Sequence, residues 1–412
     1  MIKILLLTIP LFIYAESLKE LIKTAQSNNE LVHAKEYLQK SKAKDLNSKK
    51  SAYFPTFDLG AFYKRDDDIS PFQSGDTYSG FARLSYDIYD GGKRSSSLQE
   101  AKYSLKASTL ETQAYKKSLS LQIAKDFFTI KSLQSSLGAR QEAQKSLKKQ
   151  LERTKSFYAA KMATRDDIDR VQADFDTNIY EMESIKFQIL SLLSQLSLKV
   201  GRKIENLDSS SFLKQTPTHY ETLDATKALL FQNKSIKESA GAIDSFYYPN
   251  IKIEDKYSLY GYGRQDPALT QLGVEQLANQ NTLLLSLNFR VFDYGMLKST
   301  KEAVLLSAQA LNSQITYQTE EQKLQFELSQ SRIHTANLRI KSASSALVAA
   351  SSAFDTIEKK YNAGIVDYIV FLDALTKKTN AKALYESSLN ELEIAYAILY
   401  FYSGKNLTEE LQ

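Results

Sequence analysis

The sequence predicts an α+β protein that is mostly helical and is built from one unit used twice, with long coiled-coil helices and four β-strands. Three kinds of pattern lead to this fold class. Two long stretches are almost free of residues that break helices, and short stretches alternate apolar and polar side chains. The second half of the chain also repeats the first half at a constant spacing.

The first 15 residues, MIKILLLTIPLFIYA, predict a secretory signal peptide. A lysine precedes an apolar run from Ile4 to Ile13, and Ala15 provides a small residue for cleavage. As a helix this run would reach about 15 Å, half of the ~30 Å hydrocarbon core, which disfavours a membrane anchor. No later segment has the roughly 20 apolar residues of a transmembrane helix. We therefore expect the mature protein to be exported.

Each repeat is expected to contribute two strands with one apolar face, over residues 57–63, 78–88, 251–259 and 283–291. Strands of about ten residues with this alternation are typical of transmembrane β-barrels. Aromatic residues gather where the strands meet the helices, as at an interfacial girdle. A soluble sheet packed on helices is the alternative.

Four strands cannot close a barrel alone, because the smallest membrane barrels have about eight strands. Open sheet edges do not occur in lipid, so several chains are expected to share one barrel. In such a barrel the polar side chains Lys252, Glu254 and Lys256 would face a water-filled lumen.

Long helices follow the strands. Residues 93–200 and 296–403 contain no proline and one glycine each. Because proline breaks helix interiors and glycine weakens them, residues 94–157 and 297–360 should form continuous helices of about 96 Å. Their apolar positions form two stripes, whereas a dimeric coiled coil has a single seam. Each helix is therefore expected to have neighbours on two sides, although a soluble coiled-coil bundle has the same helical pattern.

The repeat keeps one offset over most of its length. The segment LSYDIYDGGK, from Leu84, matches LNFRVFDYGM, from Leu287, which lies 203 residues later, and the same offset pairs Tyr158 with Tyr361. Before the strands the offset differs, and the helix that precedes Pro249 should be about 15 Å shorter than its counterpart. The expected boundaries are a signal peptide at 1–15, a first repeat at 16–201, a linker at 202–219, a second repeat at 220–404 and a tail at 405–412.

Composition argues against several classes of function. The net charge is only +5, so the concentrated basic surface of a nucleic-acid-binding protein is not expected. The absence of cysteine excludes disulfides, thiol catalysis and cysteine-bound metals. The three histidines are scattered, and no nucleophile–base constellation or phosphate loop is present. Neither enzyme activity nor a metal or cofactor is expected.

At the predicted helix breaks the sequence resembles the TolC-like outer-membrane efflux proteins. The second break reads YNAGIVD from Tyr361 and is followed by Asp373, and the first reads YAAKMAT from Tyr158, with Lys161 where the family has glycine. This resemblance covers nearly the whole mature chain. It implies a homotrimer with a 12-stranded barrel in the outer membrane of a Gram-negative bacterium and an α-helical tunnel through the periplasm.

The resemblance also implies a function and partners. The chain would be the exit duct of a tripartite efflux or type I secretion system, surrounded by outer-membrane lipid. A periplasmic adaptor and an inner-membrane pump of the RND, ABC or MFS type would dock onto the tunnel. The adaptor would contact the exposed tip, formed by Lys161, Met162, Ala163, Gly364, Ile365 and Val366.

A periplasmic gate at the same tip is implied as well. In the family, aspartates near the tip narrow the pore, and Asp373 falls on one of these positions. Tyr361 and Asp167 match a gate-locking pair, and Arg165 is the candidate substitute for a family arginine that Val366 replaces. From its spacing alone, Asp167 equally fits a helix N-terminal charge or a capping box with Thr164.

One alternative function is consistent with the residues alone. The chain could be an exported coiled-coil scaffold or envelope tether, with soluble strands and no channel. Membrane extraction behaviour and oligomeric mass distinguish this alternative from the duct.

Overall fold

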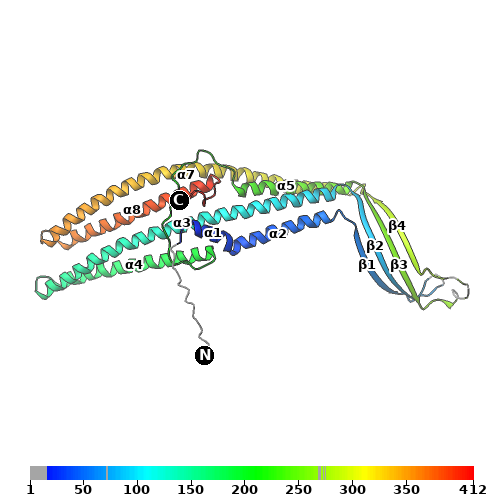
Figure 1. Ribbon diagram of the computed structural model, residues 1–412, viewed down its shortest axis with the longest axis horizontal. Coiled ribbons are helices and arrows are strands. Elements are labelled where there is room, and N and C mark those ends of the chain that lie inside the picture. The colour runs from blue at the N-terminus through cyan, green and yellow to red at the C-terminus, as the bar shows by residue number, and fades with distance from the viewer. Residues whose placement is uncertain (1–15, 71–72, 268–270, 272, 274) are drawn as a thin grey trace, which may run out of the picture. The chain divides into compact units, whose positions relative to one another are not determined.

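The computed structural model describes residues 16–70, 73–267, 271, 273 and 275–412. The predicted signal peptide, residues 1–15, lies outside the described residues. Figure 1 shows the elements in chain order. They are α1 (Leu18–Asn28), α2 (Glu30–Ser51), β1 (Thr56–Arg65), β2 (Asp76–Asp90), α3 (Lys93–Ala159), α4 (Arg165–Val200), α5 (Asp224–Asp244), η1 (Ser245–Tyr247), β3 (Asn250–Gly263), β4 (Asn279–Asn288), α7 (Met296–Asn362) and α8 (Tyr368–Tyr402).

The two repeats have the predicted order of elements. In each repeat, helix leads to a pair of strands, then to one very long helix, a short break and a second helix. The long helices α3 and α7 are continuous and have 67 residues each. A helix of that length extends about 100 Å. The expectation drawn from the absence of proline is therefore confirmed.

The chain divides into two compact units, and each unit contains parts of both repeats. One unit comprises residues up to Glu36, Glu111–Thr226 and Tyr317–Gln412, and it contains both helix breaks. We call it the helical unit. The other, the strand unit, comprises Tyr37–Leu110 and Lys227–Thr316 and contains the four strands.

The strands form one antiparallel sheet in the order β1-β2-β3-β4, so β1 and β4 are its edges. Figure 1 shows the strands side by side. The pairing of β2 with β3 joins the two repeats within one sheet. β4 ends at Asn288, before the predicted end at Val291. The difference arises because Asn288 already pairs with Asn250, the first residue of β3.

The register gives the sheet one apolar and one polar face, because directly paired residues of antiparallel strands lie on the same face. The apolar face includes the rows Leu59–Ala82–Tyr257 and Tyr86–Ile253–Leu285. These side chains are exposed in the single chain, as Leu285 at 65% illustrates. Asp255, opposite Leu84 and Leu283, places one charge within this face.

The core of the helical unit lies where the predicted linker crosses the helices. Phe212 of the linker is fully buried, and its ring centroid lies 6.0 Å from that of Phe128 in α3 and 5.9 Å from that of Tyr400 in α8. The Tyr400 hydroxyl donates to the Leu213 carbonyl at 2.6 Å. Glu393 accepts a hydrogen bond from the Phe212 N–H at 2.8 Å. The linker is therefore part of the packed structure.

The segments that flank the repeats pair with one another. Glu16, at the start of the first repeat, forms a β-bridge with Leu207 of the linker, which follows α4. Phe212 of the linker, which precedes the second repeat, forms a β-bridge with Leu411 of the tail, which follows α8. The tail, residues 405–412, consequently belongs to the helical unit.

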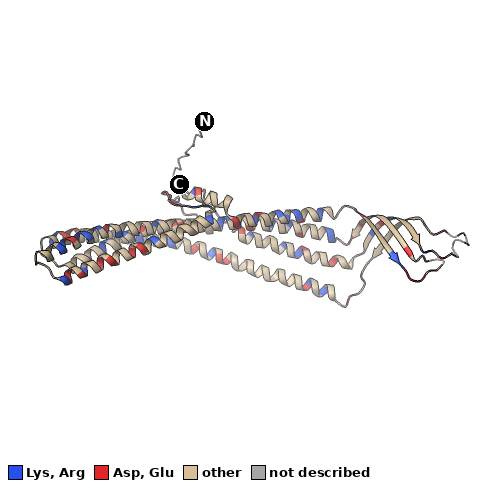
Figure 2. Ribbon diagram, turned by 90° about the horizontal axis from the view of Figure 1, so that it is seen from below, with Lys and Arg blue, Asp and Glu red and all other residues tan. Residues whose placement is uncertain are grey.

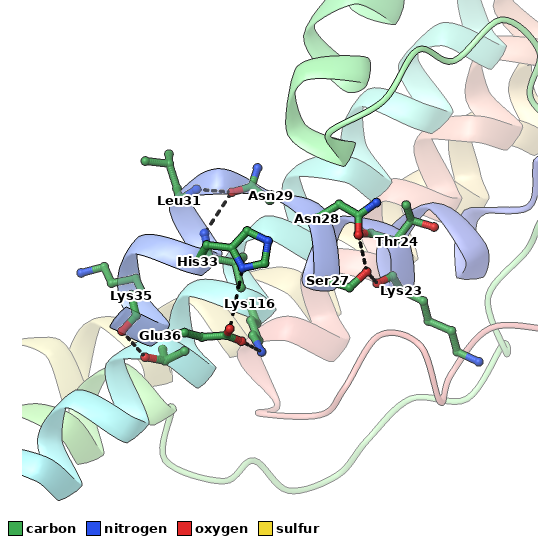
Figure 3. Close-up of polar contacts among 12 residues, drawn as sticks. Lys23, Thr24, Ser27, Asn28, Asn29, Leu31, His33, Lys35, Glu36 and Lys116 are labelled. Carbon is green, nitrogen blue, oxygen red and sulfur yellow. Dashed lines mark hydrogen bonds and ion pairs between the residues drawn. The ribbon is translucent and has the colours of Figure 1, made fainter. Parts of the chain in front are cut away.

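A helix break distinguishes the first repeat from the second before the strands (Figure 3). Asn29 lies between α1 and α2, where its side-chain oxygen accepts a hydrogen bond from the Leu31 N–H at 2.9 Å. Its side-chain amide donates to the Lys199 carbonyl at the end of α4, at 2.8 Å. The equivalent residue, Asn233, lies inside the unbroken helix α5, which ends at Asp244. The stretch of helix after the asparagine is thus shorter in the second repeat, whereas the helices α2 and α5 as wholes have 22 and 21 residues.

Charged residues of both signs are distributed along the helices (Figure 2). In α2, Lys49 and Lys50 lie in the last turn, where positive charge complements the helix macrodipole. Among the residues that the structure describes, no helix is both long enough and apolar enough to cross a lipid bilayer.

Candidate gate at the two helix breaks

The first helix break joins α3 to α4 through residues 160–164. The Lys161 N–H donates to the Tyr158 carbonyl at 2.9 Å, and the Met162 N–H donates to the Phe157 carbonyl at 2.8 Å. These two bonds end α3. Lys161 has a φ of 59°, a left-handed conformation that costs a residue with a side chain roughly 1–2 kcal/mol.

The second break, between α7 and α8, has the same backbone hydrogen bonds. The Gly364 N–H donates to the Tyr361 carbonyl at 3.0 Å, and the Ile365 N–H donates to the Lys360 carbonyl at 2.9 Å. Gly364 has a φ of 72°, which glycine adopts without strain. Lys161 therefore occupies, in the first repeat, the position that glycine occupies in the second.

The predicted gate residues of the first break make their hydrogen bonds within α4. Thr164 is the N-cap of α4, and it forms a capping box in which the Asp167 carboxylate accepts from the Thr164 N–H at 2.8 Å. The backbone and hydroxyl hydrogen bonds from Thr164 hold the pKa of Asp167 below its usual range. Arg165 pairs with Asp169, one turn further on, at 3.1 Å, and its side chain is 74% exposed.

Tyr361, the predicted gate residue at the second break, contacts both hairpins, which we define as α3/α4 and α7/α8. Its hydroxyl accepts a hydrogen bond from the Gln150 side chain in α3, and its ring stacks on Phe371 in α8 with centroids 4.9 Å apart. The Arg153 guanidinium lies 5.2 Å from the ring centroid. Burial raises the pKa of the Tyr361 hydroxyl. Within the described part of one chain, Tyr361 and Asp167 are not hydrogen-bonded to each other.

A second tyrosine links α8 directly to α4. The Tyr368 hydroxyl donates to the Asp174 carboxylate at 2.9 Å. Burial, together with this hydrogen bond, raises the pKa of Tyr368 far above its ordinary value. A further polar link joins α3 to the end of α7, where Arg153 donates to the side-chain oxygen of Asn362 at 2.6 Å.

An apolar cluster lies among these polar links and joins the two hairpins. It contains Ala143 and Leu147 of α3, Phe354 of α7 and Phe371, Ala374 and Leu375 of α8. Phe354 and Phe371 are each 4% exposed, with ring centroids 5.7 Å apart. Burying such a ring contributes about 1.5–3 kcal/mol, more than the ~1 kcal/mol of an ordinary hydrogen bond. We infer that packing holds the hairpins together and that the polar links fix their alignment.

Asp373, the predicted pore aspartate, takes no part in the links between the hairpins. Its carboxylate forms an ion pair with Lys377, one turn further along α8, at 2.8 Å. The Asp373 side chain is 59% exposed. Val370, three positions before it in the sequence, is 40% exposed. The carboxylate is thus accessible from outside the single chain.

The predicted tip residues lie in the two turns. Lys161, Met162, Gly364 and Ile365 are exposed, and Ala163 and Val366 are half-buried. Met162 and Ile365 occupy equivalent positions in the two repeats and are 74% and 70% exposed. Each turn therefore presents one large apolar side chain to its surroundings.

Sequence reasoning missed Gln150, Arg153, Asp174 and Tyr368. Their partners lie 211, 209 and 194 residues away along the chain, and no local pattern identifies such pairs. The repeat offers one signal, because Tyr368 occupies the position that Arg165 occupies in the first repeat. A half-buried tyrosine in one repeat and an exposed arginine in the other indicates that the two positions differ in role.

Comparisons with known proteins agree with this geometry. The family described as "Outer membrane efflux protein" matches residues 21–197. The outer membrane protein TolC of Vibrio cholerae is 22% identical over 413 residues, which cover 94% of this chain and 91% of the relative. TolC of Escherichia coli is 22% identical over 412 residues, covering 93% of this chain and 82% of the relative.

Solved structures have the same fold. The outer membrane protein VceC of Vibrio cholerae superposes with a TM-score of 0.80 at 16% identity, covering 95% of this chain and 96% of that chain. The CmeC outer membrane channel of Campylobacter jejuni superposes with a TM-score of 0.83 at 14% identity, covering 95% and 86%. The chain is similar to the TolC-like outer-membrane efflux proteins over nearly its whole length. This similarity supports an efflux duct in the outer membrane of a Gram-negative bacterium that extends into the periplasm.

Proposed function

We propose that three copies of the chain form one channel, with a shared 12-stranded barrel and a helical tunnel, and that this channel is the exit duct of a tripartite efflux or type I secretion system. The observation that carries the proposal is the open sheet with an apolar face. Its edge strands β1 and β4 have 10 residues each. Open edges are not tolerated in lipid, so β4 of one copy must pair with β1 of the next.

Exposed apolar side chains along two helices support this association. In α4 they are Tyr180, Phe187, Leu190 and Leu198, and in α7 they are Leu306, Tyr317, Leu324 and Leu328. Leu190 and Leu198 also line a groove of about 930 Å³ at the end of α4. Contiguous exposed apolar surface of this kind marks contact sites between proteins. In the proposed trimer, neighbouring copies cover both stripes.

The gate of this channel is assigned to the helix breaks. In the closed state, the links Tyr361–Gln150, Tyr368–Asp174 and Arg153–Asn362 hold the two hairpins of each copy together. Opening requires the hairpins to separate and these bonds to break. Asp167 and Arg165 would add contacts between copies when they release Thr164 and Asp169 and bond to residues of a neighbouring copy instead.

Selectivity in the proposed channel comes from Asp373. One accessible carboxylate per chain would form a ring in the trimer, and a ring of carboxylates in a narrow lumen favours cations. If the ring exists, Asp373→Ala should reduce cation preference and block by multivalent cations. Unchanged selectivity in that variant would remove Asp373 from the gate.

The exposed tip is the proposed contact site for partner proteins. Met162 and Ile365 supply an apolar contact at each turn for a periplasmic adaptor, which couples the duct to an inner-membrane pump of the RND, ABC or MFS type. Replacing both residues with serine should weaken pull-down of the adaptor without changing the oligomeric mass of the channel. Undiminished adaptor binding would exclude these two side chains from the interface.

The first test is the native mass of the protein extracted from outer membranes in mild detergent. The proposal requires a trimer of the mature chain that is released only by detergent. A monomer or dimer in the periplasmic fraction would contradict it and would favour a coiled-coil scaffold or envelope tether instead.

A further inference from the structure

The polar face of the sheet contains a pair of cations that the gate does not use. One cross-strand row aligns Asp58, Arg83, Lys256 and Thr282. Arg83 and Lys256 are therefore directly opposite each other on β2 and β3, an arrangement of like charges that destabilises a sheet. An anion between the two cations would offset this repulsion.

The carboxylates of this face do not supply that anion to Lys256. Glu254 forms ion pairs with Lys252 at 3.3 Å and with Arg83 at 4.0 Å, so it is shared between these two residues. Asp58 is paired in register with Arg83 on the side away from Lys256. In the part of the chain that the structure describes, Lys256 forms no ion pair with a carboxylate. The buried Nε of Arg83 has no hydrogen-bond partner either.

An aromatic ring positions both cations. The Lys256 Nζ lies 4.5 Å from the ring centroid of Phe81, and the Arg83 guanidinium carbon lies 5.3 Å from it. The ring extends over Gly60 of β1, where an added Cβ would approach it to 2.4 Å. A cation–π contact orients an ammonium group but satisfies none of its N–H donors. The geometry thus holds two cations side by side, with the Arg83 Nε donor unused and no carboxylate paired with Lys256 among the described residues.

Next to Arg83 and Lys256, the same face of the sheet carries aromatic side chains. Phe62, Ser79 and Tyr260 form a row beyond Phe81, toward the loop end of the sheet. Ser79 is 5% exposed, and its hydroxyl has no hydrogen-bond partner. A cationic pair followed by aromatic rings matches a molecule that has an anionic head and an apolar body.

We propose that Arg83 and Lys256, with Phe81, Phe62 and Tyr260, form a binding station for amphiphilic organic carboxylates. The carboxylate head accepts charge-assisted hydrogen bonds from Arg83 and Lys256, and the apolar body lies against the aromatic rings. This inference rests on the proposed function, because the polar face lines a lumen only when copies share one barrel. Each chain contributes one station, at the level of the membrane rather than at the gate.

The test uses the full-length trimer in planar bilayers, with 1-naphthoate as the probe and neutral 1-naphthalenemethanol as the matched control ligand. The station predicts that 1-naphthoate blocks conductance at concentrations at which the alcohol does not. Lys256→Gln and Arg83→Gln should each weaken this block by about tenfold, the effect of losing one charge-assisted contact. Lys256→Arg, which keeps the charge, should restore most of it.

Lys252→Gln is the matched protein control, because it removes the same charge from the same face but from a residue already paired with Glu254. The block should change by less than about twofold in this variant. An equal loss in Lys252→Gln would mean that net charge alone sets the block, and an unchanged block in Lys256→Gln would remove the station. Either result, obtained on a trimer that conducts normally, leaves the duct intact. A protein that forms no trimer and no conductance would overturn the duct and the station together.

Discussion

The two helix breaks share one backbone and differ in what their side chains reach. Lys161 and Gly364 lie in the same left-handed position and make the same hydrogen bonds. At the first break, Asp167 bonds within its own helix, whereas at the second break Tyr361 bonds across to the other hairpin. Two backbone hydrogen bonds define the same frame at both breaks, whereas the side chains around this frame differ.

The two turns of the gate therefore differ: the side chains at the first turn bond within their own hairpin, and those at the second turn bond to the other hairpin. Among the described residues of one chain, the polar side chains of Asp167 and Arg165 bond only to residues of α4 and its N-cap. The side chains that begin α8 join it to α3 and α4, and Phe371 anchors them in the shared apolar cluster. Paired substitutions at equivalent positions of the two repeats can therefore test the division directly.

The largest expected effect is the loss of the shared packing. Phe371→Ala should destabilise the contact between the hairpins by about 3–5 kcal/mol, because it leaves a cavity where a fully packed ring was. The equivalent position in the first repeat is Ile168, which is half-buried. Hydrogen exchange along α4 and α8 is the measurement. Ile168→Ala should raise exchange much less, and equal effects would contradict a connecting role for the second break alone.

The hydrogen bond of Tyr368 should come next. Tyr368→Phe removes the donor to the Asp174 carboxylate and should weaken the closed state by about 1.5–3 kcal/mol, the usual strength of a bond to a charged group. Single-channel recordings should then show more frequent opening. Arg165→Ala, at the equivalent position, breaks an exposed ion pair worth about 0–1 kcal/mol within the chain, so it should change the recordings much less than Tyr368→Phe does.

Changes in backbone strain should alter the stability of the channel less, and in opposite directions for substitutions at the two turns. Lys161→Gly should relieve the left-handed residue of the first turn, and Gly364→Ala should introduce the same strain at the second, each by about 1 kcal/mol. Beyond the two adjacent residues, no atom lies within 4 Å of a Cβ built at Gly364, so crowding by other residues does not contribute. Thermal unfolding of the detergent-solubilised channel measures both variants, and shifts of the same sign would show that the turns are not equivalent.

The smallest effect concerns pH at the first break. Hydrogen bonds from Thr164 lower the pKa of Asp167 in the folded protein, so the capping box stabilises the start of α4 fully above the unfolded carboxyl pKa, about 3.9. This stabilisation should be lost as the pH falls further, through the folded pKa. Hydrogen exchange at the first turn of α4 should therefore rise below about pH 4. Asp167→Asn should abolish this dependence, and its persistence there would assign the titration to another group.

The features that the sequence predicted correctly depend on patterns among neighbouring residues. The absence of proline predicted the long helices, and the alternation of apolar and polar residues predicted the strands. The capping box of Thr164 and Asp167, one of two alternatives for that aspartate, was visible for the same reason. The Tyr368–Asp174 bond joins residues 194 positions apart and depends on how two hairpins pack, so no sequence pattern indicated it. Asp255 was missed because one charged residue does not change an alternating pattern.

The β-bridges Glu16–Leu207 and Phe212–Leu411 have a consequence for the origin of the molecule. Each half of the chain has its first and last segments tied to each other, and only the short peptide between Asp208 and Ser211 fuses the halves. A gene divided at that point would encode two polypeptides whose ends are already secured. Two shorter subunits could thus assemble into the same arrangement of helices and strands. Gene fusion would then only have fixed the order and the ratio of the two halves.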